Sequence, residues 1–326
     1  VAGCAGLFEN ASSAPDGAYT SEEYTTLDSN AESLASSSEE SLSSESSEGF
    51  SDSSEEAPLV SGGYGYVLNN SVAVIVSYTG SDTEITIPDA LEGYDVTALG
   101  EGAFAENAEL VSVTVGNNVV NIGARAFANC TKLTEIKLGI SVAELADDAF
   151  EGCCALAAVK VAAGNRGYSD TDGILYGDGG SVLLMCPQAL EAEKLVLPKT
   201  VQHISDRAFQ RCNDIREVSI PAGCILGERA FFHCRTLASI DFEGAVEEIP
   251  ERCFFGCVAL TEITLPEGVT SIGEYAFFGC LAAETLKLPS TITSIADNAF
   301  ECCSGLTSID AQGEFAAAWL EEKGKL

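Results

Sequence analysis

The chain of 326 residues carries 50 acidic against 16 basic side chains, a formal net charge of -34. Such a surface repels phosphate and anionic lipid headgroups, so we expect no nucleic-acid partner. A hydrophobic fraction of 46% excludes a wholly disordered chain, and no stretch approaches the roughly 18 unbroken apolar residues of a membrane-spanning helix. With only two histidines, and no Ser or Cys beside either in a catalytic spacing, we expect neither an enzyme nor a cofactor.

The first part of the chain is dominated by Ser and Glu, most densely between Ala11 and Glu56. Residues 1–60 hold 13 acidic side chains and no Lys or Arg. These charges repel one another, and no apolar core offsets the entropy of ordering the chain. We therefore predict a disordered, solvated linker over residues 4–60 and a folded domain over residues 61–326.

The first four residues, Val1-Ala2-Gly3-Cys4, resemble the lipobox that ends a bacterial lipoprotein signal peptide. On that resemblance, residues 1–3 are a signal remnant and Cys4 is the acylated residue. Each buried methylene of an acyl chain contributes roughly 0.8 kcal/mol, so a lipid on Cys4 would hold the protein at a membrane. The alternative is that Cys4 is a free thiol of no consequence.

After residue 60 one short motif recurs, a small residue followed by Phe. The numbers of successive repeat Phe residues differ by 22 or 23, with one interval of 59. A fixed period in this range is typical of a solenoid, in which each unit buries its apolar face only against its neighbours. The repeated residues are Phe104, Phe127, Phe150, Phe209, Phe231, Phe254, Phe277 and Phe300.

Each unit contains the pattern of one short strand. In the unit that follows Phe127, apolar Ile136 and Leu138 alternate with charged residues. Alternation with a period of two is typical of a half-buried strand, so the units should together form a parallel sheet. The stretch from Ile272 to Cys280 breaks the alternation, and there we expect a single helical turn with its Phe pointing inward.

Cysteine recurs three residues after the Phe in seven of the units, where the first unit has Asn107. Cys and Asn at one repeat position indicate a small side chain that packs in a turn and bonds backbone groups. The spacings lack the two-residue gap of zinc knuckles, so we expect neither a metal site nor a disulfide framework. This structural ladder comprises Cys130, Cys153, Cys212, Cys234, Cys257, Cys280 and Cys303.

Residues 269–280, which read VTSIGEYAFFGC, resemble the BspA-like leucine-rich repeats of bacterial surface proteins. The likeness covers most of residues 64–311. The long interval supports it, because residues 165–176, NRGYSDTDGILY, look like the hairpin insertion common in that family, here placed at about 162–194. The tail resembles the family's closing helix, expected at about 313–323, where Phe315 and Trp319 lie one turn apart and should cover the last coil.

The resemblance implies a repeat solenoid, a leucine-rich-repeat right-handed β/α superhelix with one short parallel strand per coil. It also implies an exported or surface-anchored protein, here lipid-anchored on the extracellular face of a bacterial membrane. Family members are implicated in adhesion to host proteins or to other cells, so we expect a protein ligand and no catalysis. Another possibility is that the repeat domain serves chiefly as a structural spacer.

The insertion also offers a rival hypothesis. Asp170, Asp172 and Asp178 lie close together among glycines, and clustered carboxylates in a turn can hold Ca²⁺. A complete calcium loop would need a further ligand where Ile174 stands. The alternatives are therefore a plain β-hairpin turn and a calcium-dependent or hydrolytic site at residues 170–180.

The outward side chains of the predicted strands are the candidate binding face, because one strand from every coil would form a continuous ledge. This face contains no aromatic residue, which argues against sugar stacking and favours weak or multivalent protein binding. Contacts made by loops or by the insertion remain an alternative. The charged members of the face are Glu135, Lys137, Lys160, Glu217, Asp241, Glu262, Lys287 and Asp310.

Overall fold

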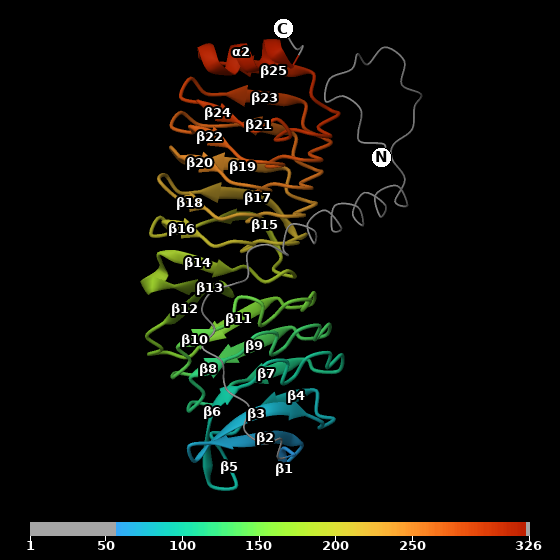
Figure 1. Ribbon diagram of the computed structural model, residues 1–326, viewed down its shortest axis with the longest axis vertical. Helices are drawn as coiled ribbons and strands as arrows, with labels where there is room; N and C mark the ends of the chain where they lie inside the picture. The colour runs from blue at the N-terminus through green and yellow to red at the C-terminus, as the bar shows by residue number, and fades with distance from the viewer. Residues whose placement is uncertain (1–56, 324–326) are drawn as a thin grey trace, which may run out of the picture. The chain divides into compact units, whose positions relative to one another are not determined.

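The computed structural model describes residues 57–323. The predictions made for residues 1–56, including acylation of Cys4, lie outside the described residues. The described part is a solenoid whose coils stack along one axis from β2 to α2 (Figure 1). Coils of about 23 residues with parallel strands confirm the predicted fold class. Within residues 57–323 no helix is both long and apolar enough to cross a bilayer.

The predicted strands form the first strand series, in which strands of neighbouring coils pair in parallel within three sheets. Ser112 lies opposite Glu135, and Glu135 lies opposite Ala158. The apolar residue between the outward positions points into the core, as Ile136 does at 0% exposure. The strands are β4 (Glu84–Thr86), β7 (Ser112–Thr114), β9 (Glu135–Leu138), β11 (Ala158–Val161), β15 (Ala192–Val196), β17 (Ile215–Ile220), β19 (Ser239–Phe242), β21 (Glu262–Thr264), β23 (Thr285–Leu288) and β25 (Ser308–Ala311).

The structure adds a second strand series that the sequence pattern did not reveal. These strands have two residues each, too few for alternation to show, and each places one apolar residue inward, such as Ile122 at 1% exposure. They also pair in parallel from coil to coil. They are β8 (Asn121–Ile122), β10 (Glu144–Leu145), β16 (His203–Ile204), β18 (Ile225–Leu226), β20 (Glu248–Ile249), β22 (Ser271–Ile272) and β24 (Ser294–Ile295).

Antiparallel strands precede the regular coils. The first three form a meander, and its third strand pairs in parallel with β6. Tyr64 and Tyr78 of this meander pack near Phe104, with ring centroids 6.4 and 5.5 Å away, so the aromatic core continues into it. The strands are β1 (Leu59–Ser61), β2 (Tyr64–Asn69), β3 (Val72–Tyr78), β5 (Ala90–Leu91) and β6 (Tyr94–Leu99).

The repeat Phe side chains stack along the core, as the sequence predicted. Phe254 lies between Phe231 and Phe277, with ring centroids 5.1 and 5.2 Å away. The helical turn expected in this region is wrong, because the segment consists of hydrogen-bonded turns. Tyr275 has a φ of 54°, and the Phe277 N–H donates to Ala299 of the next coil at 2.8 Å. Backbone groups that would close a helix bond instead to the neighbouring coil.

The insertion is a hairpin with a further strand, comprising β12 (Tyr168–Thr171), β13 (Ile174–Gly177) and β14 (Val182–Met185). It lies between β11 and β15 in the stack (Figure 1). The apolar core divides here into two clusters, and β13 contributes to both. Ile174 and Tyr176 belong to the C-terminal cluster, whereas Leu175 belongs to the N-terminal one. Because successive side chains of a strand point to opposite sides, β13 contributes to both core clusters and connects them.

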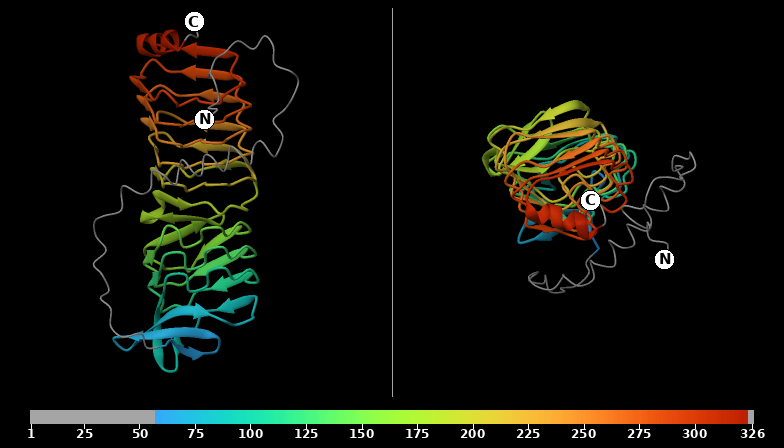
Figure 2. Two further views of the ribbon diagram at one scale, coloured as in Figure 1. Left: turned by 45° about the vertical axis from the view of Figure 1, so that its right-hand side comes forward. Right: turned by 90° about the horizontal axis from the view of Figure 1, so that it is seen from above.

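The last coil is followed by α2 (Glu314–Glu322), drawn in red at the C-terminal end of the stack (Figure 2). Trp319 is 7% exposed, and its ring centroid lies 6.0 Å from that of Phe300. The expectation that Phe315 also covers the coil is wrong, because 40% of this residue is exposed. The buried stripe of the helix runs through Ala316, Trp319 and Leu320 and leaves Phe315 at its margin.

Candidate binding face

The structure places every predicted face residue on the first strand series. We call the outward side chains of this series the strip. Within one sheet, neighbouring members of the strip lie opposite one another in register, so their spacing is that of hydrogen-bonded strands, about 4.8 Å. The predicted residues are Glu135 and Lys137 on β9, Lys160 on β11, Glu217 on β17, Asp241 on β19, Glu262 on β21, Lys287 on β23 and Asp310 on β25.

The strip is not the continuous ledge that the sequence suggested. Its strands form three separate sheets, and the insertion lies between the first and the second. There the edge of β11 is covered by the hairpin: the Val159 N–H donates to Gly173 at 2.9 Å, and the Val161 N–H donates to the Asp170 carboxylate at 2.8 Å. These backbone N–H groups of β11 would otherwise have bonded to a further coil. Because the hairpin satisfies them, the first sheet ends at β11.

The N-terminal part of the strip brings two lysines together. Lys137 and Lys160 lie directly opposite each other in register. Each is balanced by a carboxylate, Lys137 by Glu135 at 3.1 Å and Lys160 by Asp170 at 3.3 Å. Like charges on facing strands repel, and the two ion pairs offset that repulsion. Both ammonium groups are well exposed, so each pair contributes at most about 1 kcal/mol and leaves the lysines available to a ligand.

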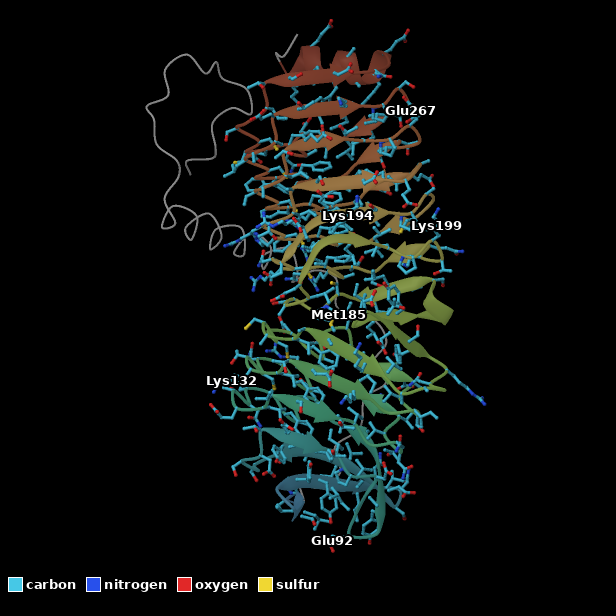
Figure 3. All side chains as sticks on the ribbon, turned by 180° about the vertical axis from the view of Figure 1, so that it is seen from behind. Glu92, Lys132, Met185, Lys194, Lys199 and Glu267 are labelled. Atoms are coloured by element: carbon cyan, nitrogen blue, oxygen red, sulfur yellow. The ribbon has the colours of Figure 1, made fainter. Side chains whose placement is uncertain are left out.

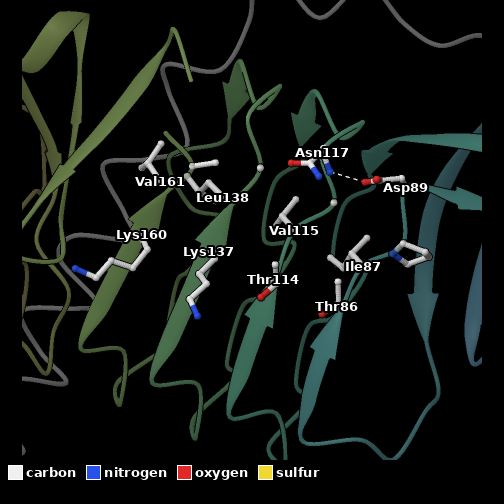
Figure 4. Close-up of a pocket in the computed structure, with 14 residues that line it drawn as sticks. Thr86, Ile87, Asp89, Thr114, Val115, Asn117, Lys137, Leu138, Lys160 and Val161 are labelled. Atoms are coloured by element: carbon white, nitrogen blue, oxygen red, sulfur yellow. Dashed lines mark hydrogen bonds between the residues drawn. The ribbon is translucent and has the colours of Figure 1, made fainter. Parts of the chain in front are cut away.

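A trough of about 370 Å³ runs along this part of the strip (Figure 4). It begins beside β4 and ends beside β11. Its wall is formed by aligned outward side chains, with Thr86 opposite Thr114 and Thr114 opposite Lys137. Its floor lies where the strands end, at Gly116 and Gly139. Side chains from four neighbouring coils, two threonines and two lysines among them, therefore line one elongated hollow.

Two successive coils have glycine directly after the strand, at positions that line the trough, and there the backbones of neighbouring coils approach closely. A Cβ on Gly116 would lie 2.7 Å from the Ile87 carbonyl oxygen, and one on Gly139 would strike the Gly116 carbonyl oxygen. Later coils have Pro221, Pro266 and Pro289 at this position. The strand pattern in the sequence did not reveal this trough. The replacement of Pro by Gly in neighbouring coils was the signal that could have revealed it.

Asp89 closes the β4 end of the trough. Its carboxylate accepts the Asn117 N–H at 2.6 Å, and its carbonyl accepts the Asn118 side-chain amide at 3.1 Å. That amide also donates to Asp95 at 3.2 Å. These bonds hold the turn after β7 against the preceding coil. The polar end of the trough is therefore fixed before any ligand arrives.

The C-terminal parts of the strip carry mixed charge. Lys287 lies in register between Thr264 and Asp310. Ser219, in register with Asp241 on the next strand, is only 3% exposed and donates to Asp241 at 3.4 Å. Its hydroxyl is therefore not exposed on the strip. The hollow and the paired lysines occur in the N-terminal sheet of the strip, so this sheet is the strongest candidate site.

The repeat cysteines form a buried ladder that joins successive coils. Their thiols donate to backbone carbonyls of the preceding coil, in most coils that of the repeat Phe. Cys234 bonds Phe209 at 2.9 Å, and Cys303 bonds Phe277 at 3.0 Å. The remaining ladder bonds are Cys130 to Phe104, Cys153 to Phe127, Cys212 to Cys186, Cys257 to Phe231 and Cys280 to Phe254.

Burial raises the pKa of the Cys234 and Cys280 thiols well above the ordinary value. It also raises the pKa of the nearby Cys224 thiol to about 11. Because the thiolate is the nucleophile and the metal ligand, these thiols are protonated and unreactive at neutral pH. Their geometry serves packing and hydrogen bonding between coils.

The insertion aspartates do not form a cation site among the described residues. The Asp170 carboxylate is occupied by the Val161 N–H and the Lys160 ammonium group. Asp172 and Gly173 form the turn between β12 and β13, with φ values of 53° and 86°. Across residues 57–323 no group of three or more His, Cys, Asp or Glu side chains is placed to hold a metal ion.

A stack of short parallel strands with an exposed strip defines a leucine-rich-repeat solenoid. The model of the BspA type leucine rich repeat region matches residues 68–169 and 188–307, in six copies. The chain therefore belongs to this family. The unmatched stretch between the two ranges contains β13 and β14 of the insertion.

Solved structures show the same fold. A leucine rich cell surface protein from Faecalibacterium prausnitzii is 23% identical, with a TM-score of 0.52; the match covers 84% of this chain and 99% of that one. The pneumococcal vaccine antigen PcpA is 16% identical, with a TM-score of 0.58, over 79% of this chain and 88% of that one. Comparison with curated proteins finds no match.

Proposed function

We propose that this protein is a non-enzymatic bacterial surface protein that adheres to host or neighbouring cells by binding a protein ligand along the strip. The observation that carries the proposal is the trough, where Thr86, Thr114, Lys137 and Lys160 lie in register across four coils. An extended segment with carboxylate and hydroxyl groups would match this row. Family membership supports a surface role, since the F. prausnitzii relative is described as a cell surface protein.

The side chains of the trough are suited to binding a ligand and not to catalysis. The residues that line the trough include threonines, lysines, an asparagine and aliphatic side chains, and the Asp89 carboxylate accepts the Asn117 N–H. A nucleophile would need an adjacent base and an orienting third group, an arrangement this trough does not supply. With few aromatic anchors, the affinity of one site should be modest, and several copies on one cell would strengthen attachment by avidity.

Anchoring through a lipid on Cys4 belongs to the same proposal. The order of lipobox, Ser/Glu segment and repeat domain would display the strip away from a membrane. Mass spectrometry of the mature N-terminus from the native cell tests this step. A chain that begins at Cys4 with added acyl mass supports it. An unmodified chain with a longer N-terminus contradicts the lipid anchor. It does not bear on ligand binding by the strip, which has its own test.

Charge reversal on the strip tests the binding role. Lys137→Glu with Lys160→Glu should reduce adhesion of protein-coated beads to target cells about tenfold, because each reversal replaces an attraction by a repulsion. Lys132→Glu with Lys199→Glu is the matched control, since these lysines lie at the edges of the coils, away from the strip (Figure 3). Equal losses for the two pairs would contradict the proposed face.

The rival reading, a calcium-dependent or hydrolytic site at residues 170–180, has less support because Asp170 is already bonded to Lys160 and Val161. Calcium binding to the folded state alone would raise the melting temperature by mass action. We expect no rise at millimolar calcium. A rise that Asp172→Ala abolishes would restore the rival.

A further inference from the structure

The two ends of the trough carry opposite charge. At the end formed by β9 and β11, Lys137 and Lys160 line the trough, whereas the carboxylates that pair with them, Glu135 and Asp170, do not line it. At the β4 end the charged lining residue is Asp89. Figure 4 shows Lys160 and Asp89 at opposite ends of the hollow. A ligand that lies along the trough therefore meets ammonium groups at one end and a carboxylate at the other.

Asp89 keeps one carboxylate oxygen for a ligand. Its Oδ1 accepts the Asn117 N–H at 2.6 Å, and its backbone carbonyl accepts the side-chain amide of Asn118 at 3.1 Å. Within the part of the chain that the structure describes, Oδ2 accepts no hydrogen bond and pairs with no cation. The residue is exposed. A cationic side chain of a ligand can therefore bond to Oδ2 and leave in place the bonds that hold the trough.

The middle of the trough is apolar. Val115 and Leu138 line it and are 2% and 1% exposed, and each lies beside one of the floor glycines, Gly116 and Gly139. An aliphatic side chain of a ligand that rests there leaves water for an apolar surface, which is favourable. A charged side chain placed there would lose hydration and gain no partner. The trough thus offers a negative end, an apolar middle and a positive end.

The distance between the charged ends sets the spacing that a ligand needs. The four strands of the trough are neighbours in one sheet, in the order β4, β7, β9 and β11. Along the stack, the coil of Asp89 therefore lies two or three strand spacings from Lys137 and Lys160, about 10–14 Å. An extended peptide advances about 3.4 Å per residue, and alternate side chains share a face. Two side chains on one face that are two residues apart span about 7 Å, too little to reach both ends, whereas four residues span about 14 Å.

We propose that the trough binds an extended peptide segment of a partner protein with a basic, an aliphatic and an acidic side chain at alternate positions. The basic side chain pairs with Asp89, the aliphatic one lies over the apolar middle, and the acidic one meets Lys137 and Lys160. This assignment rests on the proposed function and specifies its class of ligand. Because both ion contacts are exposed, each contributes little, and the common spacing provides the selectivity. Either chain direction satisfies the spacing, so the rule concerns distance and not order.

Fluorescence anisotropy of labelled synthetic peptides with the full chain tests the spacing. The matched peptide contains Arg-Ser-Leu-Ser-Glu, and the control peptide contains Ser-Arg-Leu-Glu-Ser. Both have blocked ends, so their composition and net charge are identical. We expect saturable binding of the matched peptide and about fivefold weaker binding of the control, because charges two residues apart engage only one end of the trough. Binding of the matched peptide should weaken as salt rises, because exposed ion pairs are screened.

Substitutions at the two ends assign the contacts. Asp89→Asn keeps an acceptor for the Asn117 N–H and should weaken binding of the matched peptide about threefold. The same substitution should not affect a peptide in which Ser replaces the Arg. Lys137→Gln with Lys160→Gln should weaken every peptide that carries the Glu. The matched control is Glu262→Gln, on β21 of the strip and outside the trough. Melting temperatures verify that each variant is folded.

The outcomes separate this inference from the proposed function. Equal binding of the matched and control peptides, or equal losses on Asp89→Asn and Glu262→Gln, would overturn the spacing rule. If both peptides bound equally and both lost affinity on Lys137→Gln with Lys160→Gln, the spacing rule alone would fail and binding along the strip would stand. No saturable binding of either peptide by the native chain would also overturn the inference. The adhesion of coated beads to cells would still test the proposed function by itself.

Discussion

The thiol of Cys234 donates to the backbone carbonyl of Phe209 in the preceding coil at 2.9 Å. Residues 25 positions apart in the sequence are thereby joined at the centre of the turn. The same bond between Cys and the repeat Phe recurs, for example from Cys130 to Phe104 and from Cys257 to Phe231. The ladder thus links most of the core Phe residues to the coil that follows them.

Removal of one ladder thiol should destabilise the protein. We expect Cys234→Ala to lower the free energy of unfolding by about 1–3 kcal/mol, because it leaves a small void and removes a buried hydrogen bond. Cys234→Ser, which keeps a donor, should lose less. Urea denaturation of the two variants measures the difference. If the Cys234→Ala variant were at least as stable as the Cys234→Ser variant, the thiol would only fill space and its hydrogen bond would not contribute to stability.

Truncation of a core ring should have a larger effect than truncation of the exposed ring on the closing helix. Phe254 is fully buried between two other rings, so Phe254→Ala should cost about 3–5 kcal/mol. Phe315→Ala should change stability by less than about 0.5 kcal/mol, because this side chain lies at the margin of the helix stripe. Thermal unfolding followed by circular dichroism measures both. A large loss for Phe315→Ala would contradict the described helix packing.

A methyl group in the floor of the trough should disturb the site and the fold together. Gly139 approaches the Gly116 carbonyl too closely for a Cβ, so Gly139→Ala should cost about 1–3 kcal/mol through displacement of the backbone. Gly167→Ala is the control, because its Cβ would lie 3.8 Å from the nearest heavy atom beyond its chain neighbours, the side-chain oxygen of Asn165. Calorimetric melting curves compare the two. Equal stability would show that the coils are not closely packed at this position.

Stability should fall at alkaline pH because two tyrosines are buried. Burial raises the pKa of Tyr64 and of Tyr176 from 10.0 to about 12. The folded state therefore holds its phenolic protons more tightly than the unfolded state, and this contribution is complete below about pH 10 and is lost between about pH 10 and pH 12. Tyr176→Phe should flatten the decline in denaturation midpoints over that range. If the denaturation midpoint of this variant fell as steeply as that of the native protein, groups other than Tyr176 would be responsible for the fall.

The repeat period, the core Phe ladder and the first strand series could be predicted, because each depends on residues that recur at one spacing. The second strand series could not, since two residues such as Asn121 and Ile122 are too short to show a period. The helical turn was wrong because inter-coil bonds, such as Phe277 to Ala299, outweigh local helix formation. Strand alternation located the strip, whereas the trough is lined by residues from four coils, and how those coils pack against one another does not show as a period in the sequence.

Site-directed photo-crosslinking tests the central claim, that a protein ligand lies along the strip. A photoreactive residue at Thr114, on the wall of the trough, is compared with one at Thr293, an exposed position beside the second strand series. The full-length variants are presented to target cells, and crosslinked partners are identified by mass spectrometry. We expect one cell-surface protein to be captured from Thr114, to be lost on Lys137→Glu with Lys160→Glu, and not to be captured from Thr293. Capture of the same protein from Thr293 alone, or capture unaffected by the lysine reversals, would contradict that claim.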